Sequence, residues 1–117
     1  MLTRVDHIDL KVADFPGTLH LFQTMGMHIL REMPERGSVE MSFPGENQVI
    51  FELHQAKSGG FEGVHHIAFK STAEEDVDLL KRDCNIEFLT ERTIIKHTGR
   101  TVSSFKDQNG LIWQLTD

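Results

Sequence analysis

The sequence predicts an α+β protein made of two tandem βαβββ modules. The main observation is an internal repeat, in which the segment VDHI at 5–8 is matched by VHHI at 64–67. Both segments alternate apolar and polar positions with a period of two, which is typical of a strand with one buried face. In each half of the chain, a helix pattern and three further strand patterns follow the repeated strand.

The first module is expected over about 1–55. Its first strand covers 4–12, and Asp14 and Pro16 have the residue types that favour the start of a helix. Gly26 is a typical residue for ending that helix. The three strands that follow are predicted over 27–33, 38–43 and 48–54.

The second module is expected over about 63–117, after a linker at about 56–62 that contains the turn-forming residues KSGG. Its first strand covers 64–71. Thr72 and Glu75 match a capping box that begins a helix, and Asn85 favours the left-handed conformation that ends one. Strands are then predicted over 86–94, 101–106 and 111–116, and residues 1–117 form one domain.

The composition of the chain indicates which kinds of binding partner and which cellular location to expect. A chain of 117 residues can bury one hydrophobic core. The net charge is −6 and no run of lysine or arginine occurs, so we expect neither nucleic-acid nor membrane binding. The single Cys84 excludes an internal disulfide, and no segment resembles a signal peptide or a membrane span, so a cytoplasmic protein is expected.

Side chains that can bind a metal occupy matching positions of the two modules. The first strand of each module carries a histidine on its less apolar face, and the last strand carries Glu52 or Gln114 on the corresponding face. Imidazole nitrogens and carboxylate or amide oxygens are common metal ligands. The candidate ligands are therefore His7, Glu52, His66 and Gln114.

These patterns resemble the vicinal oxygen chelate superfamily, which includes glyoxalases, bleomycin-resistance proteins and extradiol dioxygenases. The resemblance rests on DHI at 6–8, HHI at 65–67, the helix between Asp14 and Gly26, and DQNGLIWQL at 107–115, and it covers essentially the whole chain. It implies that the two modules form an incomplete mixed-sheet barrel around a divalent metal. It also implies that the four candidate ligands hold that metal.

One position departs from the pattern of the superfamily. Relatives usually carry glutamate where this chain has Gln114, and an amide oxygen can bind a metal but cannot accept a proton. Glu52 is the only carboxylate among the four candidates. We therefore expect Glu52 to be the catalytic base as well as a ligand.

The resemblance and the ligand types imply a glyoxalase-like lyase or isomerase. Such a site stabilises an enediolate or enolate of a small oxygenated substrate, and its ligands suit Zn²⁺, Ni²⁺, Co²⁺, Mn²⁺ or Fe²⁺. Two other functions stay open at this point. Two histidines and Glu52 could form the iron site of a ring-cleaving dioxygenase, or the cavity could be metal-free and sequester a ligand, as in bleomycin-resistance proteins.

Three further expectations complete the sequence-based interpretation. His54 lies on the face of Glu52 and is expected to line the substrate pocket or to support a ligand. His65 is expected on the opposite, helix-facing side of its strand. A homodimer is expected because open sheet edges favour pairing with another chain.

Overall fold

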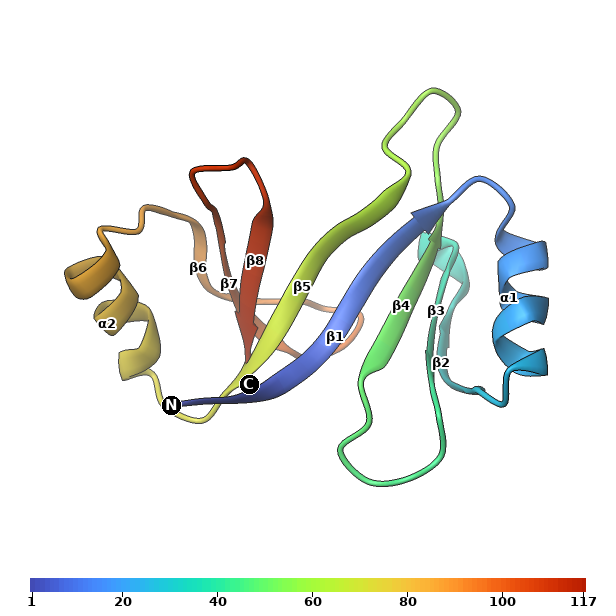
Figure 1. Cartoon of the computed structure of the whole chain (residues 1–117), viewed down its shortest axis with the longest axis horizontal. Helices are drawn as coiled ribbons and strands as arrows, with labels where there is room; N and C mark the ends of the chain where they lie inside the picture. Colours follow the sequence, from blue (N-terminus) through green and yellow to red (C-terminus); the bar gives the residue numbers. More distant parts are fainter. The chain divides into compact units, whose positions relative to one another are not determined.

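The element order of the computed structural model, which describes residues 1–117, confirms the two tandem βαβββ modules (Figure 1). The first module contains β1 (Leu2–Val12), α1 (Phe15–Thr24), β2 (His28–Met33), a short 3-10 helix η1 (Pro34–Arg36), β3 (Ser38–Ser42) and β4 (Ile50–Gln55). The second contains β5 (Gly63–Ser71), α2 (Glu75–Cys84), β6 (Phe88–Ile94), β7 (Thr101–Lys106) and β8 (Ile112–Thr116). Neither α-helix has the length and apolar composition that crossing a bilayer requires.

The chain divides into two compact units, each of which is described by itself. The first unit comprises His7–His65, and the second comprises His66–Asp117 together with Met1–Asp6. The strand order is β2-β3-β4-β1 in the first unit and β5-β8-β7-β6 in the second. In each unit one parallel pair, β1–β4 or β5–β8, is followed by antiparallel pairs, so the strand pairing is mixed.

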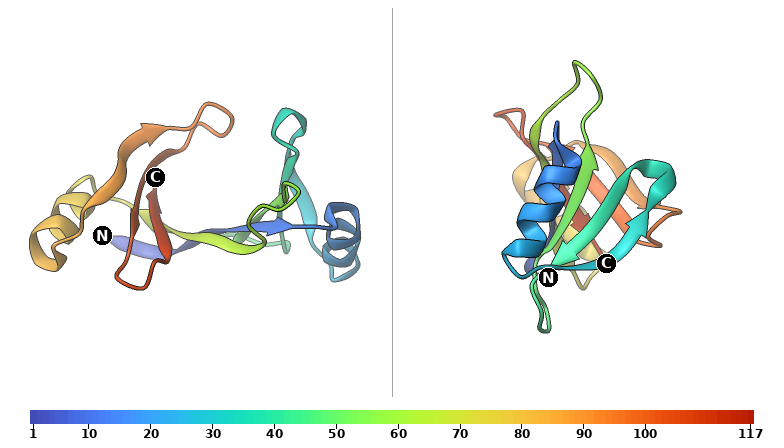
Figure 2. Two further views of the ribbon diagram at one scale, coloured as in Figure 1. Left: turned by 90° about the horizontal axis from the view of Figure 1, so that it is seen from above. Right: turned by 90° about the vertical axis from the view of Figure 1, so that its right-hand side faces the viewer.

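The sheet of the His7–His65 unit has one apolar and one polar face. Met27, Val39, Met41 and Leu53 form the apolar core, and the partly buried Phe22 of α1 packs against it. The rings of Phe22 and Phe51 meet edge to face, with centroids 5.6 Å apart. The helix therefore covers the apolar face, and Figure 2 shows α1 beside the strands of its unit.

Strand register decides which side chains share the polar face. Asp9 lies opposite Glu52 in the parallel β1–β4 pair, and Glu40 lies opposite Glu52 in the antiparallel β3–β4 pair. Residues that are directly opposite point to the same face, as do residues two positions apart in one strand. The polar face of this unit therefore carries His7, Asp9, Lys11, Ser38, Glu40, Glu52 and His54.

The second unit repeats this arrangement. In the β5–β8 pair, His66 lies opposite Ile112 and Ala68 lies opposite Gln114. Phe69 and Trp113 are stacked, with ring centroids 5.7 Å apart. Val77 of α2 is buried. Leu115 of β8 is buried as well, so both α2 and the last strand bury an apolar side chain.

The helix ends test the signals that the sequence provided. The Asp14 carboxylate accepts a hydrogen bond from the Gly17 backbone N–H at 3.0 Å, so the predicted N-cap is confirmed. Asn85 has a φ of 55° at the end of α2, which confirms the left-handed stop. The capping box of the second helix is wrong, because the Thr72 hydroxyl donates instead to the carbonyl oxygen of Met1, 3.0 Å away. The backbone carbonyl of Met1, the residue before β1, therefore replaces the helix N-terminus as its partner.

Candidate metal site

The four sequence-predicted ligands form one equivalent pair in each unit. His7 lies opposite Ile50, two residues before Glu52, so the side chains of His7 and Glu52 are diagonal neighbours on one face. His66 lies opposite Ile112, two residues before Gln114, and has the same relationship to it. The register thus supports the repeat-based choice of these residues within each unit.

Burial differs between the two pairs. The exposed fractions of His7 and Glu52 are 2% and 6%, so both are buried in the His7–His65 unit. His66 and Gln114 are half-buried. A buried carboxylate needs compensating partners, because burial removes the solvation of its charge. The surroundings of Glu52 therefore decide what it can do.

His54 connects Glu52 to a second carboxylate on the same face. The His54 Nε2–H donates to Asp9 Oδ2 at 2.7 Å and lies 3.1 Å from Glu52 Oε1. All three residues are buried, and their ligand atoms lie within 4.8 Å of one another. Histidine and carboxylates in this arrangement could hold a divalent metal ion. The predicted position of His54 on the face of Glu52 is confirmed.

The charges of this group determine the protonation of His54. Burial disfavours an imidazolium ion, but the hydrogen bonds to Asp9 and Glu52, together with their charges, outweigh burial and raise the pKa of His54 to about 9. For Glu52, burial favours the neutral acid, but the hydrogen bond from His54 and nearby histidine charges lower its pKa below the usual value. At neutral pH, His54 is therefore a cation between two carboxylates.

Each carboxylate on the polar face also has a lysine or arginine nearby. Lys11 Nζ lies 3.5 Å from Asp9 Oδ1, and Arg36 Nη1 lies 3.9 Å from Glu52 Oε1. The third buried carboxylate, Glu40, has an oxygen 3.9 Å from Arg31 Nε. Ionised carboxylates are the form that binds metals and accepts protons. The face is therefore suited to either task.

Sequence reasoning missed two acidic residues of this face. Asp9 and Glu40 have exposed fractions of 3% and 2%. The repeat directed attention to positions that match between modules, whereas Ala68 occupies the position equivalent to Asp9. Alternation along β1 could have placed Asp9 beside His7, because residues two apart share a face. Glu40 lies on β3, a strand that the metal-ligand argument did not consider.

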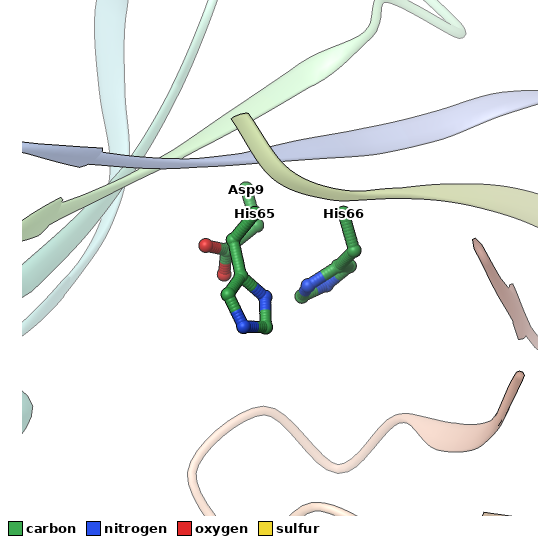
Figure 3. A group of neighbouring side chains, drawn as sticks. All are labelled: Asp9, His65 and His66. Carbon is green, nitrogen blue, oxygen red and sulfur yellow. The ribbon is translucent and has the colours of Figure 1, made fainter. Parts of the chain in front are cut away.

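His65 lies closer to the site than the sequence suggested. One of its ring nitrogens lies within 4.8 Å of a carboxylate oxygen of Asp9. Figure 3 shows its ring beside that carboxylate and also labels His66, the next residue of the chain. Burial lowers the pKa of His65, which favours a neutral imidazole. His65 therefore lies beside the polar face of its unit and not on the helix-facing side.

Comparisons with known proteins identify the fold. No protein-family model and no curated protein sequence matches the chain. Solved structures do match over almost its full length, and the chain shares their fold. The predicted fold class is therefore confirmed.

Several of the matching structures are methylmalonyl-CoA epimerases. The Streptomyces coelicolor enzyme in complex with 2-nitronate-propionyl-CoA has a TM-score of 0.74 and 20% identity, and the match covers 99% of this chain and 97% of that one. A methylmalonyl-CoA epimerase in complex with methylmalonyl-CoA and NH4+ has a TM-score of 0.73 and 21% identity, with 99% and 94% coverage. The Mycobacterium tuberculosis enzyme has a TM-score of 0.69 and 14% identity, with 98% and 87% coverage.

Proposed function

We propose that this protein is a metal-dependent isomerase of glyoxalase-like chemistry. It removes a proton from the carbon beside a carbonyl group and returns it after an enolate or enediolate has formed. The observation that carries this proposal is the pair of equivalent positions, His7 with Glu52 and His66 with Gln114, on the first and last strands of the two modules. The similarity of the fold to epimerases favours an isomerase over a lyase.

The residues present fit a divalent transition metal. In this proposal His7 and His66 provide imidazole nitrogens, Glu52 provides a carboxylate oxygen and Gln114 provides an amide oxygen. This mixture of nitrogen and oxygen donors suits Zn²⁺, Ni²⁺, Co²⁺, Mn²⁺ or Fe²⁺. When bound, such an ion would act as a Lewis acid towards the carbonyl oxygen of the substrate.

Two carboxylates on the polar face are candidates for the base. Glu52 is the base expected from the sequence, but one of its oxygens already lies 3.1 Å from His54 Nε2. If its other oxygen binds the metal, proton transfer requires a second carboxylate. Glu40 lies directly opposite Glu52 and is buried on the same face. We therefore propose Glu52 as a ligand and as the base expected from the sequence, and Glu40 as the base in the case that both oxygens of Glu52 are occupied.

The substrate to test first is an acyl-CoA with an acidic proton between two carbonyl groups. Methylmalonyl-CoA has such a proton, and it is the molecule bound to one of the structurally similar epimerases. Its two carbonyl oxygens could chelate one metal ion, which would lower the barrier to proton removal at the carbon between them. The proton that leaves this carbon is replaced by one from the base or from solvent, so no other reactant is needed.

Exchange of hydrogen for deuterium tests the proposed function. The protein is incubated in D₂O with Co²⁺ or Zn²⁺ and (2S)- or (2R)-methylmalonyl-CoA, and proton NMR follows loss of the signal of the α-proton. Exchange that depends on the metal and is lost in a His7→Ala variant supports the proposal. If the metal-loaded protein catalyses no exchange with methylmalonyl-CoA or with a simpler 1,3-dicarbonyl thioester, the proposal is wrong.

We also propose that the chain forms a homodimer. β2 and β6 have only one hydrogen-bonded neighbour strand each, and both carry exposed apolar residues, such as Leu30 and Ile94. Open edges with apolar side chains favour association. Light scattering at micromolar concentration should give twice the chain mass of 13.4 kDa. A monomer mass under these conditions would contradict this proposal.

A further inference from the structure

We propose that the His7–His65 unit binds a small organic ammonium compound in a pocket at the start of α1. The pocket has a volume of about 340 Å³, which is at the lower end of the range for sites that hold a small molecule. Its walls come from the start of α1, the ends of β2 and β4, and the turn between β2 and β3. The lining residues include Phe15, Pro16, Glu32, Pro34, Val39 and Gln55, and all of them belong to one compact unit.

This pocket lies on the helix side of the sheet, away from the candidate metal ligands. Val39 lies opposite Leu53 in the β3–β4 pair, and both residues belong to the apolar core. Glu32 lies opposite Val39 in the β2–β3 pair, and residues that are directly opposite share a face. Glu32 therefore points to the helix side, whereas Glu40 and Glu52 point to the polar face. The inference does not depend on the proposed function.

The polar side chains of the pocket offer hydrogen-bond acceptors. Gln55 Nε2 already donates to nearby backbone carbonyl oxygens at 2.7 to 3.2 Å, and Gln55 Oε1 accepts no hydrogen bond from the chain. The Glu32 carboxylate has no hydrogen bond or ion pair within the chain, and no lysine, arginine or histidine lines the pocket. Ser38 also lines it, but its side chain lies opposite His54 and belongs to the polar face. A ligand must therefore bring donors.

The charges of the pocket favour a cation over an anion. The ammonium group of a ligand would complement the Glu32 carboxylate, and the aromatic ring of Phe15 can also attract a cation. The net charge of −6 acts in the same direction. A helix N-terminus often binds an anion, but here the Asp14 carboxylate accepts the Gly17 N–H at 3.0 Å and Pro16 has no N–H to offer.

The apolar part of the lining determines the rest of the ligand. Pro16, Pro34 and Val39 present hydrocarbon surface beside the carboxylate of Glu32. A bare inorganic cation would leave this surface in contact with water, whereas an organic ammonium compound with an aromatic or aliphatic group would cover it. The ligand class is therefore a small amine with an apolar substituent.

The second unit has a pocket in the corresponding place. That pocket has a volume of about 280 Å³, and its lining includes Arg92, Ser103 and Leu115. Ser103 lies opposite Leu115 in the β7–β8 pair, as Val39 lies opposite Leu53 in the β3–β4 pair. The two pockets are therefore equivalent between the modules.

A cation from the chain itself occupies the second pocket. The backbone N–H of Arg92 donates to Ser103 Oγ at 2.8 Å, so Arg92 corresponds to Glu32 of the first unit. Arg92 Nη2 donates to the carbonyl oxygen of Glu74 at 2.9 Å and lies 3.5 Å from Asp78 Oδ2. The first pocket has a carboxylate in this place and no basic side chain in its lining. We therefore infer that a ligand supplies its cation.

Titration of the full chain with 2-phenylethylammonium tests this inference. A chelator is present, so that no bound metal contributes. Neutral 2-phenylethanol and anionic 3-phenylpropanoate are matched probes of similar size. NMR follows the backbone amide of Gly37 and the side-chain amide of Gln55, which both belong to lining residues. The ammonium probe should bind with a dissociation constant on the order of 1 mM, and the neutral probe about fivefold more weakly, because an exposed ion pair contributes modestly.

Two variants of Glu32 test the role of its charge. Glu32→Gln should bind the ammonium probe about fivefold more weakly and bind 2-phenylethanol as the wild type does. Glu32→Lys places a cation where the second unit has Arg92 and should abolish binding of the ammonium probe. Both variants should keep the wild-type melting temperature, because Glu32 is exposed. Glu35→Gln is the matched control, since Glu35 is an exposed carboxylate of η1 that does not line the pocket.

Three results would each overturn the inference. They are wild-type affinity of Glu32→Gln for the ammonium probe, equal affinity of the wild type for the three probes, and no change in the signals of Gly37 and Gln55. None of these results bears on the proposed function, whose test requires a metal and a thioester substrate.

Discussion

Glu40 and Glu52 lie directly opposite each other across the β3–β4 pair, with exposed fractions of 2% and 6%. Two buried carboxylates in such positions repel each other unless cations separate them. Arg31 lies near Glu40, and Arg36 and His54 lie near Glu52. This compensation allows two acidic groups to occupy one face, where one can bind a metal and the other can move a proton.

The first prediction separates the roles of these two carboxylates. Glu52→Gln should reduce proton exchange by at least about 100-fold, because an amide cannot accept the proton. The metal should stay bound, since the amide oxygen can replace one carboxylate oxygen. Exchange rates and metal content are measured on the same samples. An active Glu52→Gln variant would show that Glu52 is not the base, and Glu40→Gln would then be expected to lose exchange instead.

The second prediction concerns the loop before β8, which the Asp107 side chain organises. Its Oδ1 accepts hydrogen bonds from the backbone N–H groups of Asn109 and Leu111, at 2.8 and 3.0 Å, and its Oδ2 accepts one from Trp113 Nε1 at 2.9 Å. Asp107→Ala should lower the melting temperature and shift the emission of Trp113, the only tryptophan, to longer wavelength. Asp83→Ala, at an exposed position beside Arg82, is the control. Unchanged emission in Asp107→Ala would contradict the contact.

The third prediction follows from the protonation of the same side chain. The hydrogen bond from Trp113 is the main cause that holds the pKa of Asp107 below its usual value. A carboxyl group with a lowered pKa stabilises the folded state above the pKa of the unfolded chain, and this contribution is lost as the pH falls through the folded-state value. The stability difference between the wild type and Asp107→Asn should therefore shrink below about pH 4. Urea unfolding at several pH values measures it, and a constant difference would contradict the prediction.

The sequence predicted the fold because its signals were local and repeated. Alternation around His7 and His66, the N-cap Asp14 and the stop at Asn85 each depend on a few neighbouring residues, and the structure has these features where they were expected. The capping box at Thr72 failed because its partner, the carbonyl oxygen of Met1, is far away in the sequence. Long-range partners of this kind cannot be read from a local pattern.

For the candidate site, the sequence indicated only ligands at positions that are equivalent in the two modules. His7, Glu52, His66 and Gln114 were chosen as candidates because they match between modules, whereas Asp9 has Ala68 at its equivalent position and was not considered. His54 was placed on the correct face, but its bridge to Asp9 depends on the register of β1 against β4. Register across a parallel pair is set by the packing of the whole sheet. Site residues that occur in only one module therefore could not be identified from the internal repeat.

The last prediction concerns metal removal. A ligand that binds only the folded state stabilises it by about 2.7 kcal/mol when its concentration is 100 times the dissociation constant. Protein treated with a chelator and dialysed should therefore melt at a lower temperature than protein with excess Zn²⁺ or Co²⁺. His7→Ala should remove this difference, since His7 is buried beside Glu52 and provides a predicted ligand. His20→Ala, an exposed position on α1, is the control and should keep the wild-type response. Calorimetry measures the shift, and an equal response in His7→Ala and wild type would show that the metal binds elsewhere.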